Sequence, residues 1–438
     1  MPNAPVPVDP FLLRQLAAET EARAARTPAP VSTATGAPAE LLDALARAVA
    51  ERGPELGAAS HDLAAHPEVG WAEHRSSAAL ADLAERHGIH VTRGAFGLET
   101  ALVAEVGTGG PTVAVLSEYD ALPGIGHGCG HNVIATAGLG AFLALAAVGD
   151  ALPGRVVWLG TPAEEGGSGK EYLARAGAFD GVDAALMVHP SSYDLAESVF
   201  LGRRQLRATF TGITSHASAQ PFMGRNALDA AQLMYTGVGL HRQQLPPTDR
   251  VHGIVTDGGE RPNVIPERAE LVFYLRSEYP ESLKILSGRL ADIAEGAALM
   301  TGCGVELSWD DAPPYLPLRT NQRLAEDWNR RYGDRGHAMV AAGVVPSTFA
   351  GSTDFGNVSF RVPGLHAMVK IADADVSLHT REFAAAAVTG TADGVVVDAA
   401  TALAAVAADY LLDATFRQAV DDDFAAAGGA LDVPGYFD

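Results

Sequence analysis

The chain has 438 residues, 47% of them hydrophobic and 19% charged, so it can bury sizeable cores and is too long for one ordinary domain. Its formal charge of −22 argues against a nucleic acid or an anionic membrane as a partner, because either would be repelled. The two cysteines and the lack of a recognisable targeting or membrane-spanning segment predict a soluble protein of the reducing cytoplasm.

The N-terminal part is predicted to be an extension followed by helices. Residues 1–38 combine a short amphipathic helix over 11–26 with a linker rich in proline, alanine, threonine and glycine. Leucine spacing predicts a helix over 39–66 that breaks near Gly53-Pro54, because proline removes a helical hydrogen bond. A helix over 75–87 and a strand over 99–106 follow.

Apolar strands then alternate with helices. The strands span residues 112–116, 155–160 and 183–188, and helices over 132–147 and 169–176 separate them. Such alternation is typical of an α/β fold with a mostly parallel sheet flanked by helices. In these sheets the ligand site lies beyond the carboxyl ends of the strands, and here each of the three strands ends at a side chain that can bind a metal ion.

The pattern changes after Ser198. Strand, helix, strand, strand, helix and strand follow one another up to Trp309, which is the order of a ferredoxin-like α+β unit. The sequence therefore predicts a second domain over 200–316, inserted into a first domain made of 39–199 and 317–412. The first domain resumes with a helix over 319–332, a strand over 364–371 and a helical region over 383–412. Residues 413–438 form an acidic tail that is predicted to be peripheral.

Seven side chains able to bind metals follow the strands of the first domain. They are Asp120, Cys129, His131, Glu164, Glu165, His189 and His379. One ion needs three or four ligands, whereas two ions about 3.5–4 Å apart would use most of the set. Zinc suits mixed sulfur, nitrogen and oxygen donors, and manganese or cobalt would also fit. We therefore predict two divalent metal ions per chain.

The adjacent carboxylates need separate roles. Side chains of Glu164 and Glu165 cannot both point the same way from an extended backbone. One is expected to bind metal and the other to act as the general base that takes a proton from a metal-bound water. Asp120 is expected to orient a ligand histidine or to touch a metal. From the residues alone, the assignment of the two glutamates stays open.

Seven segments, spread over roughly residues 40–410, resemble the aminoacylase, carboxypeptidase-G and hippurate-hydrolase family of dinuclear metallo-amidohydrolases. They are SEYDALPGIGHGCGHN, TPAEEGG, MVHP, GITSHASAQPFMGRNALDA, RPNVIPERAELVFYLR, GSTDFGNVS and SLHTREF. The Cys-Gly-His unit is similar to that of hippurate and auxin-conjugate hydrolases. EYDALPG and GSTDFGNVS look more like the aminobenzoyl-glutamate hydrolase and β-alanyl-lysine-type dipeptidase group.

This resemblance implies a ligand set, a base and a reaction. The implied ligands are Cys129, His131, Glu165, His189 and His379. Glu164 would be the general base in the hydrolysis, by a metal-bound hydroxide, of an amide bond in a dipeptide or an N-acyl or N-aroyl amino acid. Glu118 stands where many members of the family have a histidine, which leaves open the ligand that bridges the two ions.

The inserted domain resembles the lid and dimerisation domain of the same family. By that resemblance His216 stabilises the oxyanion of the tetrahedral intermediate, often from the partner subunit of a homodimer. Asn263 and Arg276 match positions that grip the substrate, with Arg276 a candidate for binding its free carboxylate. A homodimer that acts on a small amide or dipeptide is therefore expected.

Two other functions compete with this one. Cys129 could be a nucleophile with His131 as its base, although this leaves Glu164 and Glu165 without a role. Alternatively, the chain could be a non-catalytic metal-binding or scaffolding paralogue that kept the fold. The full set of implied ligands and the presence of Glu164 speak against this second alternative.

Overall fold

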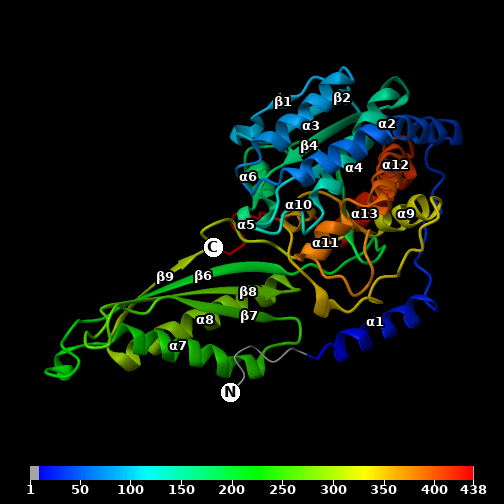
Figure 1. Ribbon diagram of the computed structural model, residues 1–438. Coiled ribbons are helices and arrows are strands. Elements are labelled where there is room, and N and C mark those ends of the chain that lie inside the picture. The colour runs from blue at the N-terminus through cyan, green and yellow to red at the C-terminus, as the bar shows by residue number, and fades with distance from the viewer. Residues whose placement is uncertain (1–8, 438) are drawn as a thin grey trace. The chain divides into compact units, whose positions relative to one another are not determined.

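The computed structural model describes residues 9–437, and the chain forms two compact units (Figure 1). Unit 1 comprises the chain up to Ser198 together with Arg319–Phe349 and Asn357–Val433. Unit 2 comprises Val199–Leu318, Ala350–Gly356 and the C-terminal residues from Pro434. Each unit has a hydrophobic core of its own. That residues 39–199 with 317–412 and residues 200–316 fold as separate domains stays a prediction.

Unit 1 is built on a six-stranded sheet with the order β1-β2-β4-β3-β5-β10. Four strands run parallel: β3 (Thr112–Glu118), β4 (Arg155–Thr161), β5 (Ala184–Ser191) and β10 (Gly364–Lys370). At one edge β2 (Leu102–Gly107) and the short β1 (Thr92–Arg93) are antiparallel. The parallel strands are buried almost from end to end, as expected when both faces of a sheet are covered. The prediction of a mostly parallel α/β sheet is confirmed.

Helices make up most of the rest of unit 1. They are α1 (Phe11–Ala24), α2 (Ala39–Ala65), α3 (His74–Arg86), α4 (His131–Ala147), α5 (Glu164–Gly167), α6 (Gly169–Arg175), α9 (Gln322–Gly333), α11 (Arg381–Ala386), α12 (Gly390–Leu412) and α13 (Ala414–Ala426). Among them the largely exposed α1 contributes no residue to the hydrophobic core. Three 3₁₀ turns accompany the helices, η1 (Ala95–Gly97), η2 (Gly149–Ala151) and η5 (Ser347–Phe349), and α10 (Phe355–Ser359) precedes β10. Helices α4 and α12 pack against each other and against the parallel strands, and α2 packs against both helices (Figure 1).

Helix α12 is long and apolar enough to cross a membrane by length and composition. However, 83% of its most apolar window is buried inside the structure, which is how the core helix of a folded domain behaves. The sequence predicts no spanning segment, because its longest apolar stretch, residues 133–148, is short and interrupted by glycines, and this stretch lies largely in α4. Half of the sixteen buried residues of α12 are alanines, whose small side chains let neighbouring helices approach closely.

The predicted break at Gly53-Pro54 is wrong, because α2 runs without interruption from Ala39 to Ala65. Leu45, Val49 and Leu56 on one face of α2 are all buried in the core. Burying each such side chain stabilises the fold by about 1.5–3 kcal/mol. Together they outweigh the roughly 3 kcal/mol that an interior proline costs a helix.

The segment predicted to be a peripheral tail contributes to the core of unit 1. It contains α13, whose Phe416 and Val420 are buried with the main hydrophobic cluster. Asp413 caps this helix by accepting hydrogen bonds from the backbone amides of Thr415 and Phe416. The acidic composition of the segment conceals the apolar stripe, because Asp421 and its neighbours lie on the exposed face.

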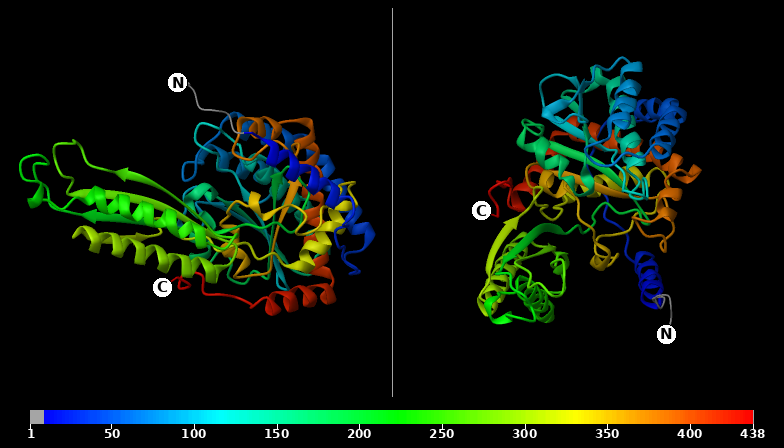
Figure 2. Two further views of the ribbon diagram at one scale, coloured as in Figure 1. Left: turned by 90° about the horizontal axis from the view of Figure 1, so that it is seen from below. Right: turned by 60° about the vertical axis from the view of Figure 1, so that its left-hand side comes forward.

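Unit 2 is a four-stranded antiparallel sheet with the order β7-β8-β6-β9. Its strands are β6 (Gly202–Thr211), β7 (Arg250–Asp257), β8 (Arg268–Ser277) and β9 (Gly304–Trp309), and its helices are α7 (Ala227–His241) and α8 (Pro280–Thr301), with 3₁₀ turns η3 (Pro221–Met223) and η4 (Arg242–Gln244). Figure 2 shows both helices side by side along the sheet, where Leu206, Phe210 and Phe273 form part of the core. The predicted ferredoxin-like unit is confirmed.

Asp409 on α12 is a fully buried anion that joins three segments of unit 1. Its carboxylate accepts two hydrogen bonds from Arg331, at 2.6 and 2.7 Å, and one from the backbone amide of Ala37 at 2.5 Å. Arg330 lies 3.2 Å from the same carboxylate. Removing one partner of a buried ion pair leaves the other partner charged and poorly solvated.

We expect Asp409→Ala to lower the free energy of unfolding by about 3–5 kcal/mol, because Arg331 loses its buried anion and Arg330 keeps only its pair with Asp327. Urea unfolding followed by tryptophan fluorescence measures this, since Trp328 is buried in the same core. Asp393→Ala on the same helix is the matched control, because Asp393 pairs with His61 in an exposed position. Its change should stay below about 1 kcal/mol. Equal losses in the two variants would contradict the role given to Asp409.

Candidate metal centre

The carboxyl ends of the parallel strands bring the predicted ligands to one edge of the sheet in unit 1. Strand β3 leads to Asp120, β4 leads to Glu164 and Glu165, and His189 lies near the end of β5. His379 lies in the loop between β10 and α11. Because the strands are parallel and adjacent, their ends share the same edge, as the sequence predicted.

A glycine-rich loop after β3 delivers the thiol and one imidazole. Gly130 has φ +76°, a left-handed conformation, and a Cβ there would lie 2.7 Å from the ring of Pro190. Only glycine fits this position, and α4 begins at the next residue, His131. The carbonyl of Gly128 accepts a hydrogen bond of 2.8 Å from the backbone amide of His379, which ties the loop to the last predicted ligand.

The donor atoms of these residues converge. The Cys129 Sγ lies 3.3 Å from the Nε2 of His189 and 3.5 Å from the Nε2 of His379. Glu165 Oε1 lies 3.6 Å from His379 Nε2 and 4.0 Å from His131 Nε2. Donor spacings of this kind suit ligands that share a cation.

Three overlapping groups of potential ligands arise from this arrangement, each with its donor atoms within 4.8 Å of one another. They are Cys129 with His131 and His189, Cys129 with Glu165 and His379, and His131 with Glu164 and Glu165. Because the groups share members but no single one contains all the donors, the set fits more than one cation better than a single ion.

Asp120 orients the imidazole of His131. Its Oδ1 lies 3.0 Å from His131 Nδ1, while its Oδ2 accepts a 2.9 Å hydrogen bond from the backbone amide of Glu165. The proton shared with Asp120 therefore belongs to Nδ1, and the lone pair of Nε2 faces the other donors. Among residues 9–437, no hydrogen-bond partner is found for His131 Nε2 or for Glu165 Oε1. Buried polar atoms without partners at the point of convergence are what a bound cation would satisfy.

Burial sets the protonation of the donors. It raises the pKa of the Cys129 thiol well above its ordinary value and lowers the pKa of His189 to about 4. Burial also acts to lower the pKa of His131, but the hydrogen bond and charge of Asp120 outweigh it, so the pKa of His131 is raised. A divalent cation binds the deprotonated thiol and the neutral imidazole, so it must displace the protons that these groups carry. A higher pKa of a ligand therefore makes metal binding more dependent on pH.

A buried ion pair beside the centre was not predicted from the sequence. Glu118, at the end of β3, pairs with Lys170 on α6, and both side chains are completely buried. Burial alone would raise the pKa of Glu118. The positive charges of Lys170 and of the nearby histidines outweigh burial, so the net effect is a lowered pKa and an ionised carboxylate. Glu118 Oε2 lies 3.4 Å from His131 Nε2, so this anion also faces the donor cluster. Little in the sequence singles out Lys170, because it is one lysine in a short predicted helix and its partner Glu118 is distant in the sequence.

The predicted site residues of the inserted domain belong to unit 2. His216 is exposed, and its Nδ1 accepts hydrogen bonds from the amides of Ser218 and Ala219, at 3.2 and 3.1 Å. The loops that carry His216 and Asn263 pair with each other, since the amide of Ala217 donates to the Asn263 carbonyl at 3.0 Å. The structure thus brings these two predicted residues together.

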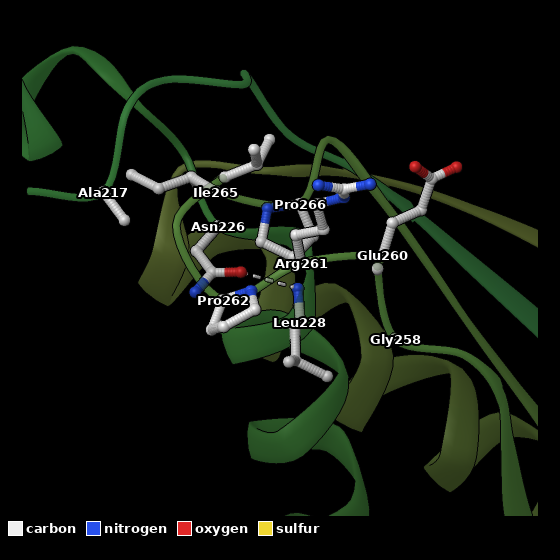
Figure 3. A pocket seen from close by; sticks show the side chains of 11 residues that line it. Ala217, Asn226, Leu228, Gly258, Glu260, Arg261, Pro262, Ile265 and Pro266 are labelled. Carbon is white, nitrogen blue, oxygen red and sulfur yellow. Dashed lines mark hydrogen bonds between the residues drawn. The ribbon is translucent and has the colours of Figure 1, made fainter.

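Two further features of unit 2 lie on β8 and beside the Asn263 loop. Half-buried Arg276, on β8, donates a 2.9 Å hydrogen bond from Nη1 to the Ser352 hydroxyl. A pocket of about 340 Å³ lies beside the Asn263 loop, with Asn226, Arg261 and Ile265 in its lining (Figure 3). Asn226 caps α7, because its side-chain oxygen accepts a hydrogen bond from the amide of Leu228.

Comparison with known proteins gives consistent matches. Residues 114–410 match the family model described as Peptidase family M20/M25/M40. The chain is 38% identical to the Xaa-Arg dipeptidase of Mus musculus over 91% of this chain and 95% of that protein. It is 33% identical to a p-aminobenzoyl-glutamate hydrolase component of Escherichia coli, over 81% and 88%. A dinuclear metal-binding peptidase of the M20 family from Bacillus subtilis superposes with a TM-score of 0.64 at 21% identity, covering 82% of this chain and 99% of that one.

We expect Asp120→Asn to weaken the binding of zinc or manganese about 10–100-fold, because an amide can no longer accept both the His131 and the Glu165 hydrogen bonds. Competition with a chromophoric chelator measures the affinity. Asp62→Asn is a suitable control, because Asp62 is partly exposed and pairs with Arg75. Unchanged affinity in Asp120→Asn would contradict the orienting role.

Proposed function

Because the chain belongs to peptidase family M20/M25/M40, we propose that it is a metal-dependent hydrolase that cleaves the amide bond of a dipeptide or an N-acyl or N-aroyl amino acid. The family membership confirms the resemblance drawn from the sequence motifs. The observation that carries the proposal is the convergence of Cys129, His131 and the other donors in overlapping groups at one sheet edge. The full-length match to a dipeptidase supports the same reaction class.

Five side chains would hold two divalent cations: Cys129, His131, Glu165, His189 and His379. Zinc suits this mixture of donors best, and manganese or cobalt would also fit. The ions would polarise the scissile carbonyl and lower the pKa of the attacking water. The overlapping ligand groups support two ions, and the chain shares its fold with a dinuclear metal-binding peptidase.

Glu164 is the proposed general base. Its carboxylate is buried and lies in the same donor group as His131 and Glu165. In this role it takes a proton from the attacking water and later gives a proton to the leaving amine. Asp120 supports the reaction indirectly by fixing the ring of His131.

Residues of unit 2 are proposed to bind the substrate and its developing charge. Because His216 Nδ1 accepts two backbone hydrogen bonds, its proton lies on Nε2, which suits donation to an oxyanion. Arg276 keeps one donor to spare, since its buried Nε has no hydrogen-bond partner within residues 9–437. A guanidinium with a spare donor suits a substrate carboxylate, and the exposed Asn263 is proposed to assist.

A dipeptide with a cationic C-terminal residue is the proposed substrate. The −22 charge of the chain attracts a cationic dipeptide and repels an aminobenzoyl-glutamate, which carries two negative charges. The relative named Xaa-Arg dipeptidase is also the more similar of the two compared, in identity and in the share of the chain covered. The proposed location is the cytoplasm.

We further propose a homodimer formed through unit 2. Strand β7 lies at the edge of the four-stranded sheet, and its Ile254 and Val255 are 63% and 50% exposed. An exposed edge strand with apolar side chains offers unpaired backbone groups to a second copy.

A cysteine nucleophile is supported less well. Cys129 is buried, and it has ring nitrogens of His189 and His379 close by rather than a single base. This is the environment of a metal ligand. A non-catalytic paralogue would hold metal and hydrolyse none of the amides tested, so measuring metal content and hydrolysis together distinguishes it from an enzyme.

We expect Glu164→Gln to lower kcat about 10²–10⁴-fold while the metal content stays at the wild-type value, because the variant removes the base and keeps the proposed ligands. Hydrolysis of Xaa-Arg, Xaa-Lys, N-acyl amino acids and aminobenzoyl-glutamate is followed by release of the free amino acid, with metal content measured on the same samples. Chelation of the wild type should abolish turnover. Normal turnover in Glu164→Gln would refute the base assignment, and wild-type protein that holds metal but cleaves nothing would favour the non-catalytic alternative.

We expect kcat/KM for an Xaa-Arg dipeptide to fall severalfold when ionic strength rises from about 0.01 to 0.15 M, because the Debye length shrinks from roughly 30 to 8 Å. A neutral dipeptide of similar size is the control and should show little change. A salt-independent kcat/KM for the cationic substrate, or a clear preference for aminobenzoyl-glutamate, would contradict the proposed substrate class.

A further inference from the structure

We propose that Glu73 is a positioning residue for catalysis: its carboxylate fixes the strained backbone at Ala163 and thereby aims Glu164. The inference rests on the proposed role of Glu164 as general base. Glu73 lies just before α3, about ninety residues away from Ala163 in the sequence, and its side chain is fully buried. It lies outside all the sequence motifs that predicted the site.

Glu73 makes three hydrogen bonds within unit 1. Its Oε1 accepts from the backbone amide of Ala163 at 2.8 Å and from that of Trp71 at 3.0 Å. Its Oε2 accepts from the hydroxyl of Thr100 at 2.8 Å. One carboxylate thus joins the segment before α3, the turn that precedes β2 and the residue that precedes Glu164.

Ala163 needs such an anchor because its backbone is strained. It has φ +54° and ψ +48°, a left-handed conformation that costs an alanine about 1–2 kcal/mol. Its surroundings are tight: a Cβ on Gly167 would lie 2.7 Å from the Ala163 Cβ, and one on Gly70 would lie 3.1 Å from it. The carbonyl of Ala163 also accepts a 3.2 Å hydrogen bond from the amide of Gly169. Strain that is held in place directly beside a proposed catalytic group is typical of functional sites.

The residue on the other side of Glu164 is held independently. Asp120 accepts the hydrogen bond of the Glu165 amide, so two carboxylates hold the amides that flank Glu164. If the bond from Glu73 is lost, Ala163 can relax toward a right-handed conformation and turn Glu164 away, while Asp120 still holds Glu165. Loss of Glu73 should therefore lower turnover more than it lowers metal binding.

The charge of Glu73 is not what the position requires. Burial, together with the negative charge of Asp120, raises the pKa of Glu73 above its ordinary value. A glutamine has the same shape, and its amide oxygen can still accept from Ala163 and Trp71 while its NH₂ group faces the Thr100 hydroxyl. Glu73→Gln therefore preserves the anchoring bond, whereas Glu73→Ala removes it.

Glu68 provides a matched control from the same segment. Its carboxylate accepts hydrogen bonds from the amides of Arg75 and Ser76, at 3.0 and 2.7 Å, and from the Ser76 hydroxyl at 2.8 Å. These bonds cap α3 and do not reach Ala163. Glu68→Ala removes as many hydrogen bonds as Glu73→Ala and should lower thermal stability without changing kcat.

The experiment compares kcat, KM, metal content and thermal stability of the metal-loaded wild type, Glu73→Ala, Glu73→Gln and Glu68→Ala. We expect Glu73→Ala to lower kcat about 100-fold, as displaced catalytic groups do, with KM and metal content near the wild-type values. Glu73→Gln should retain kcat within about threefold, since the accepting oxygen remains. Hydrogen exchange of the peptide covering 162–169 should be faster in Glu73→Ala and unchanged in Glu68→Ala.

Three results would overturn the proposal. One is an equal loss of kcat in Glu73→Ala and Glu68→Ala, which would indicate a general loss of stability. The second is a Glu73→Gln variant as inactive as Glu73→Ala, and the third is unchanged exchange over 162–169. Because hydrogen exchange is measured without substrate, it tests the anchor even if the wild type hydrolyses no amide, and that outcome would refute the proposed function alone.

Discussion

The hydrogen bonds of the Asp120 carboxylate link the parts of unit 1 that carry the proposed centre. One oxygen meets the ring of His131 at the start of α4, and the other meets the backbone of Glu165 after β4. Asp120 itself follows β3, which lies between β4 and β5 in the sheet. The position of one carboxylate therefore fixes two donor residues, one at the start of a helix and one in the segment after a strand, and the sheet order makes these contacts possible.

Such a site concentrates negative charge in a place with little water. Glu118, Asp120 and Glu164 are all buried, and Glu165 is nearly so. Lys170 compensates one of these anions directly, through its pair with Glu118. Buried charges need partners, and the donors of His131 and Glu165 face one another with unsatisfied atoms among the residues that the structure describes. Divalent cations satisfy this arrangement in a way that further hydrogen bonds within the protein do not, which is why the charge balance itself supports the metal proposal.

The strand ends could be predicted from the sequence because their signal is local. Apolar runs mark the parallel strands, and parallel strands share an edge, so the amino-acid sequence alone was enough to place Asp120, Glu164 and His189 together. Contacts between distant segments left no such signal. Pro54 looked like a helix break because the packing of α2 against α4 and α12 is invisible in its own sequence. Lys170 and Glu73 were missed for the same reason, since their partners lie 52 and 90 residues away.

The two adjacent glutamates show how a local conflict is resolved by distant contacts. Neighbouring side chains on a regular strand point to opposite faces, and on a regular helix they diverge by about 100°. Here the backbone is neither: Ala163 is left-handed, Glu165 has a ψ of +67°, and Gly166 has a φ of +86°. These kinks let both carboxylates join one donor group with His131. Glycine at position 166 favours its own positive φ, but nothing in the local sequence favours the left-handed conformation of Ala163. Glu73 on one side and Asp120 on the other supply the bonds that select this irregular backbone, so the geometry of the proposed base and of its neighbouring ligand depends on carboxylates that would not themselves react.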